Sequence, residues 1–219
     1  MRLDKGHAAE LLTRIAGRKV LVLGDLMLDE YLFGEVNRIS PEAPVPIVRV
    51  TRENWVLGGA ANVAANLIAI GAVPLVVGTL QKDVAGERLM GIFARLGIAR
   101  DGLVLDPSRP TIIKTRVIGQ TQQMLRIDRE EAGALDGGVI ADLAERLARL
   151  IPECGALVVS DYAKGVIGPE VMEVVHGRCK AHGIPWIVDP KPKHRALYQG
   201  ATLMTPNTKE TAELADLPA

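Results

Sequence analysis

Short aliphatic runs alternate along the chain with segments whose apolar residues recur every three or four positions. The runs end in a polar residue, which is typical of strands buried on both faces of a parallel sheet. The periodic segments predict amphipathic helices, and Gly97 and Gly183 stand where helix C-caps are expected. The order of these elements predicts a layered α/β domain. The expected strands are 19–25, 73–80, 155–161, 184–190 and 201–207, and the expected helices are 59–70, 84–96, 138–150 and 168–182.

Two stretches, 31–52 and 110–128, interrupt this alternation with β-rich sequence and no helix between. The second predicts a hairpin that turns at Gly119, Gln120 and Thr121. We therefore expect a small second sheet that projects from the first. An antiparallel edge of the main sheet is the alternative that the pattern leaves open.

Composition narrows the class of protein. A length of 219 residues suits one domain, and 48% hydrophobic residues suit a globular one. Lys plus Arg and Asp plus Glu both number 26, and aromatic residues make up only 3%, so we expect no nucleic-acid partner. No apolar run approaches the roughly 18 residues of a membrane span, so we expect no membrane partner. The charged N-terminus is no signal peptide, and two cysteines form no disulfide framework, which predicts a cytoplasmic protein.

The candidate chemistry lies where strands end, because ligands of open α/β sheets bind beyond the carboxyl ends of the strands. Asp29 follows the first strand. Gly58 and Gly59 open a small-residue helix whose first turn carries Asn62, an arrangement that suits a hydroxyl-rich ligand. A tight turn that opens an alanine-packed helix is the structural alternative.

Three later segments add charge at the same edge. In 161–165, Lys164 could meet a phosphate and Asp161 could position a hydroxyl or a metal-bound water, or the segment is a salt-bridged surface turn. Lys191 begins a basic run that suits anions, unless the run is merely solvated. Asn207 and Glu210 predict a helix capping box. A functional contact with Mg²⁺ through bound water is compatible with this structural role but is not needed to explain the two residues. The chain has neither a Walker A loop nor a G-x-G-x-x-G motif.

Together these motifs resemble the ribokinase/PfkB carbohydrate kinases, and among them the bacterial D-glycero-β-D-manno-heptose 7-phosphate kinases. The similarity runs from about residue 19 to the C-terminus. It implies a Rossmann-like α/β/α fold with a β-lid. It also implies ATP-dependent, Mg²⁺-assisted phosphorylation of the anomeric hydroxyl of heptose 7-phosphate, which feeds ADP-heptose and lipopolysaccharide core synthesis, and it allows a fused adenylyltransferase domain. The segments that carry the resemblance are 24–31, 40–48, 58–62, 161–165, 189–191 and 205–210.

The resemblance also assigns residues. The expected sugar-binding residues are Asp29, Gly58, Gly59 and Asn62, with Asp161 and Lys164 as further substrate contacts. Lys191, Asn207, Thr208, Lys209 and Glu210 are expected at ATP and its phosphates, with Glu210 reaching Mg²⁺ through water. On the presumed lid, Lys114, Arg116 and Arg126 are expected to hold the 7-phosphate. Relatives pair their lids, so we expect a homodimer through the segment that contains Val45, Ile47 and Val48.

One family element is absent. No Gly-Ala-Gly-Asp sequence, whose aspartate would be the general base, occurs in the chain. We therefore expect residues 1–219 to be the N-terminal two-thirds of a kinase domain, with the base beyond Ala219 and negligible turnover by the chain alone. A PfkB-type kinase for another sugar and a non-catalytic sugar-phosphate-binding or dimerisation module are the alternatives.

Overall fold

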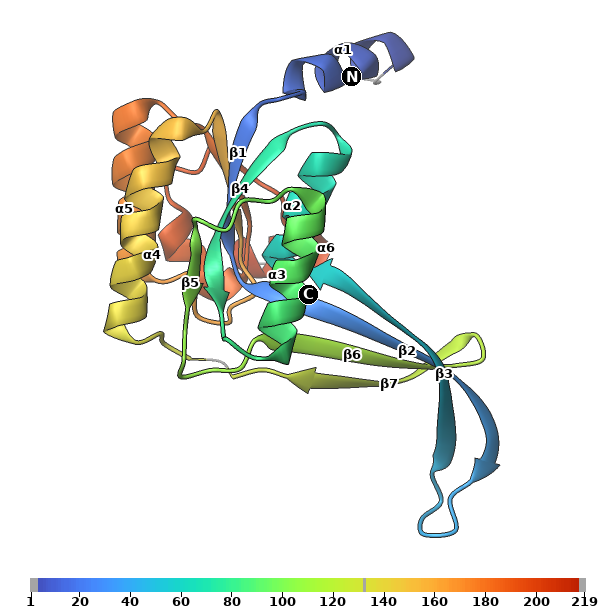
Figure 1. The fold of residues 1–219 in the computed structure, drawn as a ribbon. Helices are drawn as coiled ribbons and strands as arrows, with labels where there is room; N and C mark the ends of the chain where they lie inside the picture. Colours follow the sequence, from blue (N-terminus) through green and yellow to red (C-terminus); the bar gives the residue numbers. More distant parts are fainter. Residues whose placement is uncertain (1–3, 132, 217–219) are drawn as a thin grey trace.

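A computed structural model describes residues 4–131 and 133–216 and contains two sheets (Figure 1). The main sheet has the strand order β10-β9-β8-β1-β4-β5, and all its pairings are parallel, as predicted. Its strands are β1 (Lys19–Gly24), β4 (Val73–Leu80), β5 (Leu103–Leu105), β8 (Ala156–Ser160), β9 (Trp186–Asp189) and β10 (Leu203–Met204).

Helices cover both faces of this sheet, with α4 and α5 on one side and α2 and α3 on the other (Figure 1). Leu143, Leu147 and Met172 lie fully buried in the first core, and Leu89 and Phe93 in the second. The helices are α1 (Lys5–Ile15), α2 (Gly59–Ala69), α3 (Val84–Leu96), α4 (Gly137–Leu150), α5 (Pro169–His182) and α6 (Thr208–Leu214), with 3₁₀ turns η1 (Ile151–Glu153) and η2 (Pro192–Tyr198).

The four periodic segments form helices within one residue of their predicted limits, and Gly97 and Gly183 cap two of them in the left-handed conformation. Three elements were not predicted: β5 is only three residues long, α1 buries no residue, and η2 lies within the basic run that begins at Lys191. The strand expected over 201–207 is shorter, since only Leu203 and Met204 pair. Among the described helices, none is both long and apolar enough to cross a membrane.

The second sheet, called the lid below, has the order β3-β2-β6-β7 and projects from the main sheet (Figure 1). Its strands are β2 (Leu26–Ile39), β3 (Pro46–Gly58), β6 (Ile112–Gly119) and β7 (Gln122–Arg129). A separate lid sheet is therefore confirmed, and the alternative of an edge of the main sheet is wrong. The predicted hairpin between β6 and β7 is also confirmed.

The first lid segment is longer than the expected 31–52 because β2 continues from β1 after one residue and β3 runs to the start of α2. Leu26 and Leu28 at the base of the lid are buried with α2 and α3, so the lid shares its root with the core of the domain. The chain therefore passes from one sheet into the other without a flexible linker.

Gly24 makes this passage sterically feasible. A Cβ atom at this position would lie 2.1 Å from the carbonyl oxygen of Ser160, at the end of the neighbouring strand β8. No side-chain rotation relieves a clash with backbone. The crossing point therefore requires a residue without a side chain.

We expect Gly24→Ala to lower the free energy of unfolding by about 3 kcal/mol, since two backbone segments must separate to admit the methyl group. Gly177→Ala is the matched control: Gly177 is exposed within α5, and its added Cβ would meet nothing within 4 Å. Alanine there should raise the free energy of unfolding by about 0.5 to 1 kcal/mol. Urea denaturation monitored by circular dichroism measures both, and equal effects of the two changes would contradict the packing argument.

Candidate functional site

Asp25 shapes the carboxyl edge of the sheet from inside. It follows β1 directly and is 1% exposed. Its carboxylate accepts backbone N–H hydrogen bonds from Tyr162 (2.9 Å), Lys164 (3.1 Å) and Val166 (3.2 Å). Burial raises the pKa of Asp25 against the opposing effect of these three donors. The residue therefore fixes the conformation of the loop after β8.

Asp161 has a different environment from the one expected of a substrate contact. Its Oδ1 accepts the N–H of Ala163 at 2.6 Å, and its Oδ2 accepts the hydroxyl of Tyr198 at 2.5 Å and lies 2.6 Å from His194 Nδ1. The residue is 1% exposed. In this structure its carboxylate joins the 161–165 loop to η2 and presents no free oxygen to a ligand.

The residues expected to bind sugar meet at the base of the lid. Asp29 on β2 lies against Gly58, the N-cap of α2, where an added Cβ would be 2.7 Å from Asp29 Oδ2. Gly59 has φ of 53°, and its added Cβ would be 2.5 Å from the carbonyl oxygen of Asp25. Asn62 is exposed in the first turn of α2. The backbone conformation and the contact with backbone therefore require glycine at position 59, whereas Gly58 leaves room for the Asp29 carboxylate beside the start of α2.

Strand register gathers charge on one face of the lid. Asp29 pairs with Lys114, which pairs with Asp128. The next row of the same face carries Arg116 opposite Arg126. Paired residues project to the same side of a sheet, so three of the expected cations share the face of Asp29.

Each of these cations has a carboxylate partner. Arg116 Nη1 lies 2.5 Å from Asp29 Oδ1, and this hydrogen bond raises the pKa of Arg116. Lys114 Nζ lies 3.2 Å from Asp128 Oδ2, while Arg126 Nε donates to Asp128 Oδ1 at 2.9 Å. The lid face is therefore charged and largely neutralised within itself.

Glu130 is a site residue that sequence reasoning missed. Its Oε1 lies 2.5 Å from Lys164 Nζ, and its Oε2 lies 3.3 Å from Lys114 Nζ. Burial opposes the ionisation of Glu130, but hydrogen bonds and charges from the two lysines lower its pKa overall. The available signal was the spacing of Arg126 and Asp128 on β7 and Glu130 directly after it, because residues two apart in extended chain point to the same side.

A second cluster gathers residues expected at the nucleotide. Asn207 caps α6 and forms the predicted capping box with Glu210, confirmed by bonds of 2.9 and 3.0 Å. Glu210 Oε1 also lies 2.6 Å from Lys191 Nζ. Thr208 and Lys209 are exposed in the same helical turn.

The second cluster fits a hydrated cation better than a directly bound one. Both Glu210 oxygens already accept hydrogen bonds, and Asp189, at the end of β9, has a pKa raised by burial and by the charge of Glu210. Within residues 4–131 and 133–216, no group of three or more metal-binding side chains surrounds one point. Mg²⁺ commonly keeps several waters and takes one or two carboxylates, so Glu210 would reach it through water.

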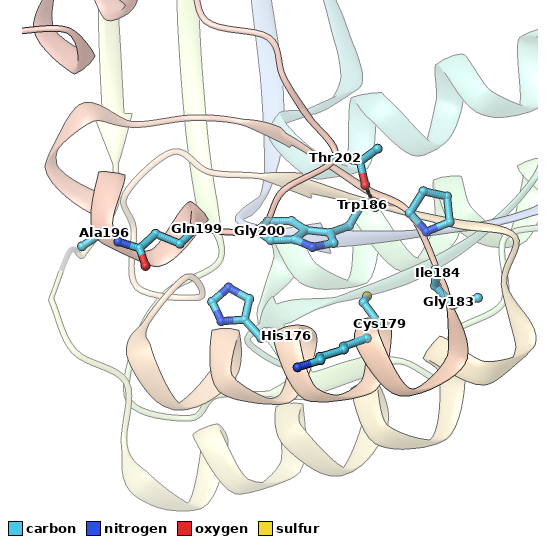
Figure 2. A pocket seen from close by; sticks show the side chains of 11 residues that line it. His176, Cys179, Gly183, Ile184, Trp186, Ala196, Gln199, Gly200 and Thr202 are labelled. Carbon is cyan, nitrogen blue, oxygen red and sulfur yellow. Dashed lines mark hydrogen bonds between the residues drawn. The ribbon is translucent and has the colours of Figure 1, made fainter.

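A hollow with a volume of about 680 Å³ lies elsewhere. Figure 2 shows His176 and Cys179 of α5 facing Trp186, the first residue of β9, across it. No carboxylate lines it, and it lies where strands begin rather than end. We therefore assign the candidate site to the charged clusters.

Glu210→Gln should make stability less sensitive to acid. The pKa of Glu210 is lowered in the folded state, so the folded state binds fewer protons than the unfolded state near the ordinary pKa of 4.5. The stabilisation is present above that pH and is lost as the pH falls. We expect urea denaturation from about pH 6 to about pH 3.5 to show a smaller loss in Glu210→Gln than in the parent chain. An equal loss would show that the Lys191–Glu210 pair contributes nothing to the folded state.

Comparison with known proteins matches residues 18–219 to the pfkB family of carbohydrate kinases. The chain is 47% identical over 203 residues to the D-beta-D-heptose 7-phosphate kinase of Bordetella bronchiseptica, covering 91% of this chain and 62% of that protein. It is 47% identical over 207 residues to the bifunctional protein HldE of Caulobacter vibrioides, covering 94% of this chain and 42% of that protein.

Solved structures support the same fold at low sequence identity. Phosphofructokinase-2 from Escherichia coli in complex with potassium superposes with a TM-score of 0.67 at 21% identity, covering 93% of this chain and 64% of that one. Arabidopsis thaliana ribokinase complexed with ribose and ATP gives 0.64 at 18% identity, with the same coverages. The predicted ribokinase-like fold is confirmed.

Proposed function

Because the chain belongs to the pfkB family of carbohydrate kinases, we propose that it forms the sugar site and lid of an ATP-dependent heptose 7-phosphate kinase. The reaction transfers the γ-phosphoryl group of ATP to the anomeric hydroxyl of D-glycero-β-D-manno-heptose 7-phosphate. The product, a 1,7-bisphosphate, serves ADP-heptose and lipopolysaccharide core synthesis in the cytoplasm. Since some relatives are named bifunctional, a fused adenylyltransferase belongs to the same proposal.

The observation that carries this proposal is the position of Asp29. Its carboxylate lies against Gly58 at the start of α2 and shares a lid face with Lys114 and Arg116. A carboxylate accepts hydrogen bonds from sugar hydroxyls, and the amide of Asn62 can both donate and accept them. The cations on the same face can take the phosphate at the other end of the sugar. The groups that would bind the sugar hydroxyls thus lie next to the groups that would bind the phosphate.

The Lys191–Glu210 cluster would serve ATP. Lys191, Asn207, Thr208 and Lys209 would face its phosphates, and Glu210 would hold Mg²⁺ through water. When bound, Mg²⁺ neutralises charge on the transferring phosphoryl group. The protein's own part is to position the two substrates, since phosphoryl transfer depends mainly on alignment and charge stabilisation.

In a version extended at its C-terminus to the length of the heptose 7-phosphate kinase relative, Asp29→Asn should lower kcat/KM by about 30- to 100-fold. The change removes a charged acceptor from a part-buried site. Asn62→Ala should act in the same direction, while Asp142→Asn, on the exposed side of α4, should leave the rate unchanged. ATP-dependent phosphorylation of heptose 7-phosphate measures all three. Full activity of Asp29→Asn, or robust turnover by the 219-residue chain, would contradict the proposal.

The lid would also form the interface of a homodimer. Large apolar side chains on it are exposed, including Val45 (52%), Val50 (44%) and Leu125 (54%). The lid strands extend beyond the core, where no other part of the described chain covers them (Figure 1). A second lid would bury these side chains.

Leu125→Lys should shift the dimer toward monomer, because it places a charge in the proposed interface and leaves the core untouched. Val73→Lys is the control: Val73 is 43% exposed at the start of β4, at the other end of the domain. Light scattering at tens of micromolar measures the molar mass. A monomeric parent chain, or an equal response to both changes, would argue against the lid interface.

A further inference from the structure

Glu130 and two lysines resemble an anion site in which the bound anion is the carboxylate of Glu130. Each carboxylate oxygen faces a separate ammonium group, Lys164 at 2.5 Å and Lys114 at 3.3 Å. The three side chains are 14 to 22% exposed, so the pairs are partly shielded from water and open to exchange. The two lysines come from different parts of the molecule, β6 of the lid and the loop after β8.

Without Glu130, the two ammonium groups would lack a shared counter-ion. Both lie within hydrogen-bond reach of one carboxylate, and like charges at such separations repel. Of the two lysines, Asp128 contacts only Lys114, and it also pairs with Arg126. The Lys164 ammonium contacts no other carboxylate within 4 Å in the described residues. Glu130 therefore supplies the charge that allows the two lysines to converge.

We infer that Glu130 occupies the place of a phosphate monoester and leaves it when the phosphate of the substrate binds to Lys114 and Lys164. This inference rests on the proposed function, whose substrate carries such a group. A phosphate monoester brings close to two negative charges and three acceptor oxygens, against one charge and two oxygens on Glu130. It can therefore replace both pairs at once, which a neutral sugar cannot do.

Two consequences follow for specificity and for the lid. Glu130 makes the site select a phosphorylated sugar, because only a dianion compensates for the displaced carboxylate. Glu130 also directly follows β7, the last strand of the lid, and its contact with Lys164 joins it to the loop that Asp25 shapes. When Glu130 leaves Lys164, the segment that follows β7 would no longer be held to that loop as the substrate enters.

The sign of the Glu130→Gln effect separates this role from simple positioning of the lysines. If Glu130 competes with phosphate, the variant should bind heptose 7-phosphate about 3- to 10-fold more tightly and leave the affinity for unphosphorylated heptose unchanged. If Glu130 only positions the lysines, the variant should bind the phosphorylated sugar more weakly. Isothermal titration of the 219-residue chain with both sugars, and with inorganic phosphate as a probe, measures these affinities.

The matched control is Glu35→Gln, which removes a lid glutamate paired with Arg49 at 2.6 Å, away from the two lysines. It should leave all affinities unchanged. Lys164→Met should weaken binding of the phosphorylated sugar, and adding Glu130→Gln to it should tighten binding less than in the parent chain. ATP serves as a further arm: tighter binding of ATP alone would assign the lysines to the nucleotide and overturn the inference.

The remaining outcomes are also decisive. If the parent chain binds heptose 7-phosphate and Glu130→Gln does not tighten it, the inference is wrong while the proposed substrate stands. If neither chain binds any phosphate ligand, the lysine pair is no anion site and the inference fails. If Glu130→Gln tightens binding but an extended, ATP-supplied version transfers no phosphoryl group, the inference holds and the proposed reaction fails.

Discussion

The structure depends on one buried carboxylate at the junction of its two sheets. Asp25 follows the last residue of β1 and precedes the first residue of β2, so it lies where the chain leaves the core for the lid. Its carboxylate accepts hydrogen bonds from three backbone N–H groups of the loop after β8, which carries Lys164, and so holds this loop in place. A buried carboxylate is costly unless it is hydrogen-bonded, and these three donors offset that cost. The same interaction therefore stabilises the junction and positions a residue of the site.

Charge pairing is the second organising feature. The formal net charge of the whole chain is zero, and at the site each cation has a carboxylate partner: Lys114, Arg116, Arg126, Lys164 and Lys191 each contact one. Such partly exposed pairs contribute little to stability, yet they hold cations in place before a ligand arrives. Binding of an anion then exchanges one partner for another instead of ordering free side chains. The site is thus preorganised by its own acidic residues.

Much of the fold could be predicted because its signals are local. Helical periodicity located α2 to α5, aliphatic runs located the central strands, and Asn207 with Glu210 predicted the capping box that the structure contains. Short or exposed elements escaped prediction, since β5 has three residues and α1 buries none. The lid begins earlier than predicted, at Leu26, because the buried residues Leu26 and Leu28 continue the apolar pattern of β1.

The sequence alone determined which residue types stand at the strand ends, because the turns, caps and charge runs that they form extend over only a few positions. Only the tertiary structure decided which of these side chains contact one another. It turned Asp161 inward to Tyr198 and His194, and it placed Glu130 between lysines of the lid and the core. The partners in these contacts are 16 to 37 residues apart, and those of Asp25 are 137 to 141 apart. Strand order and packing alone bring such residues together, and no local sequence pattern predicts these contacts.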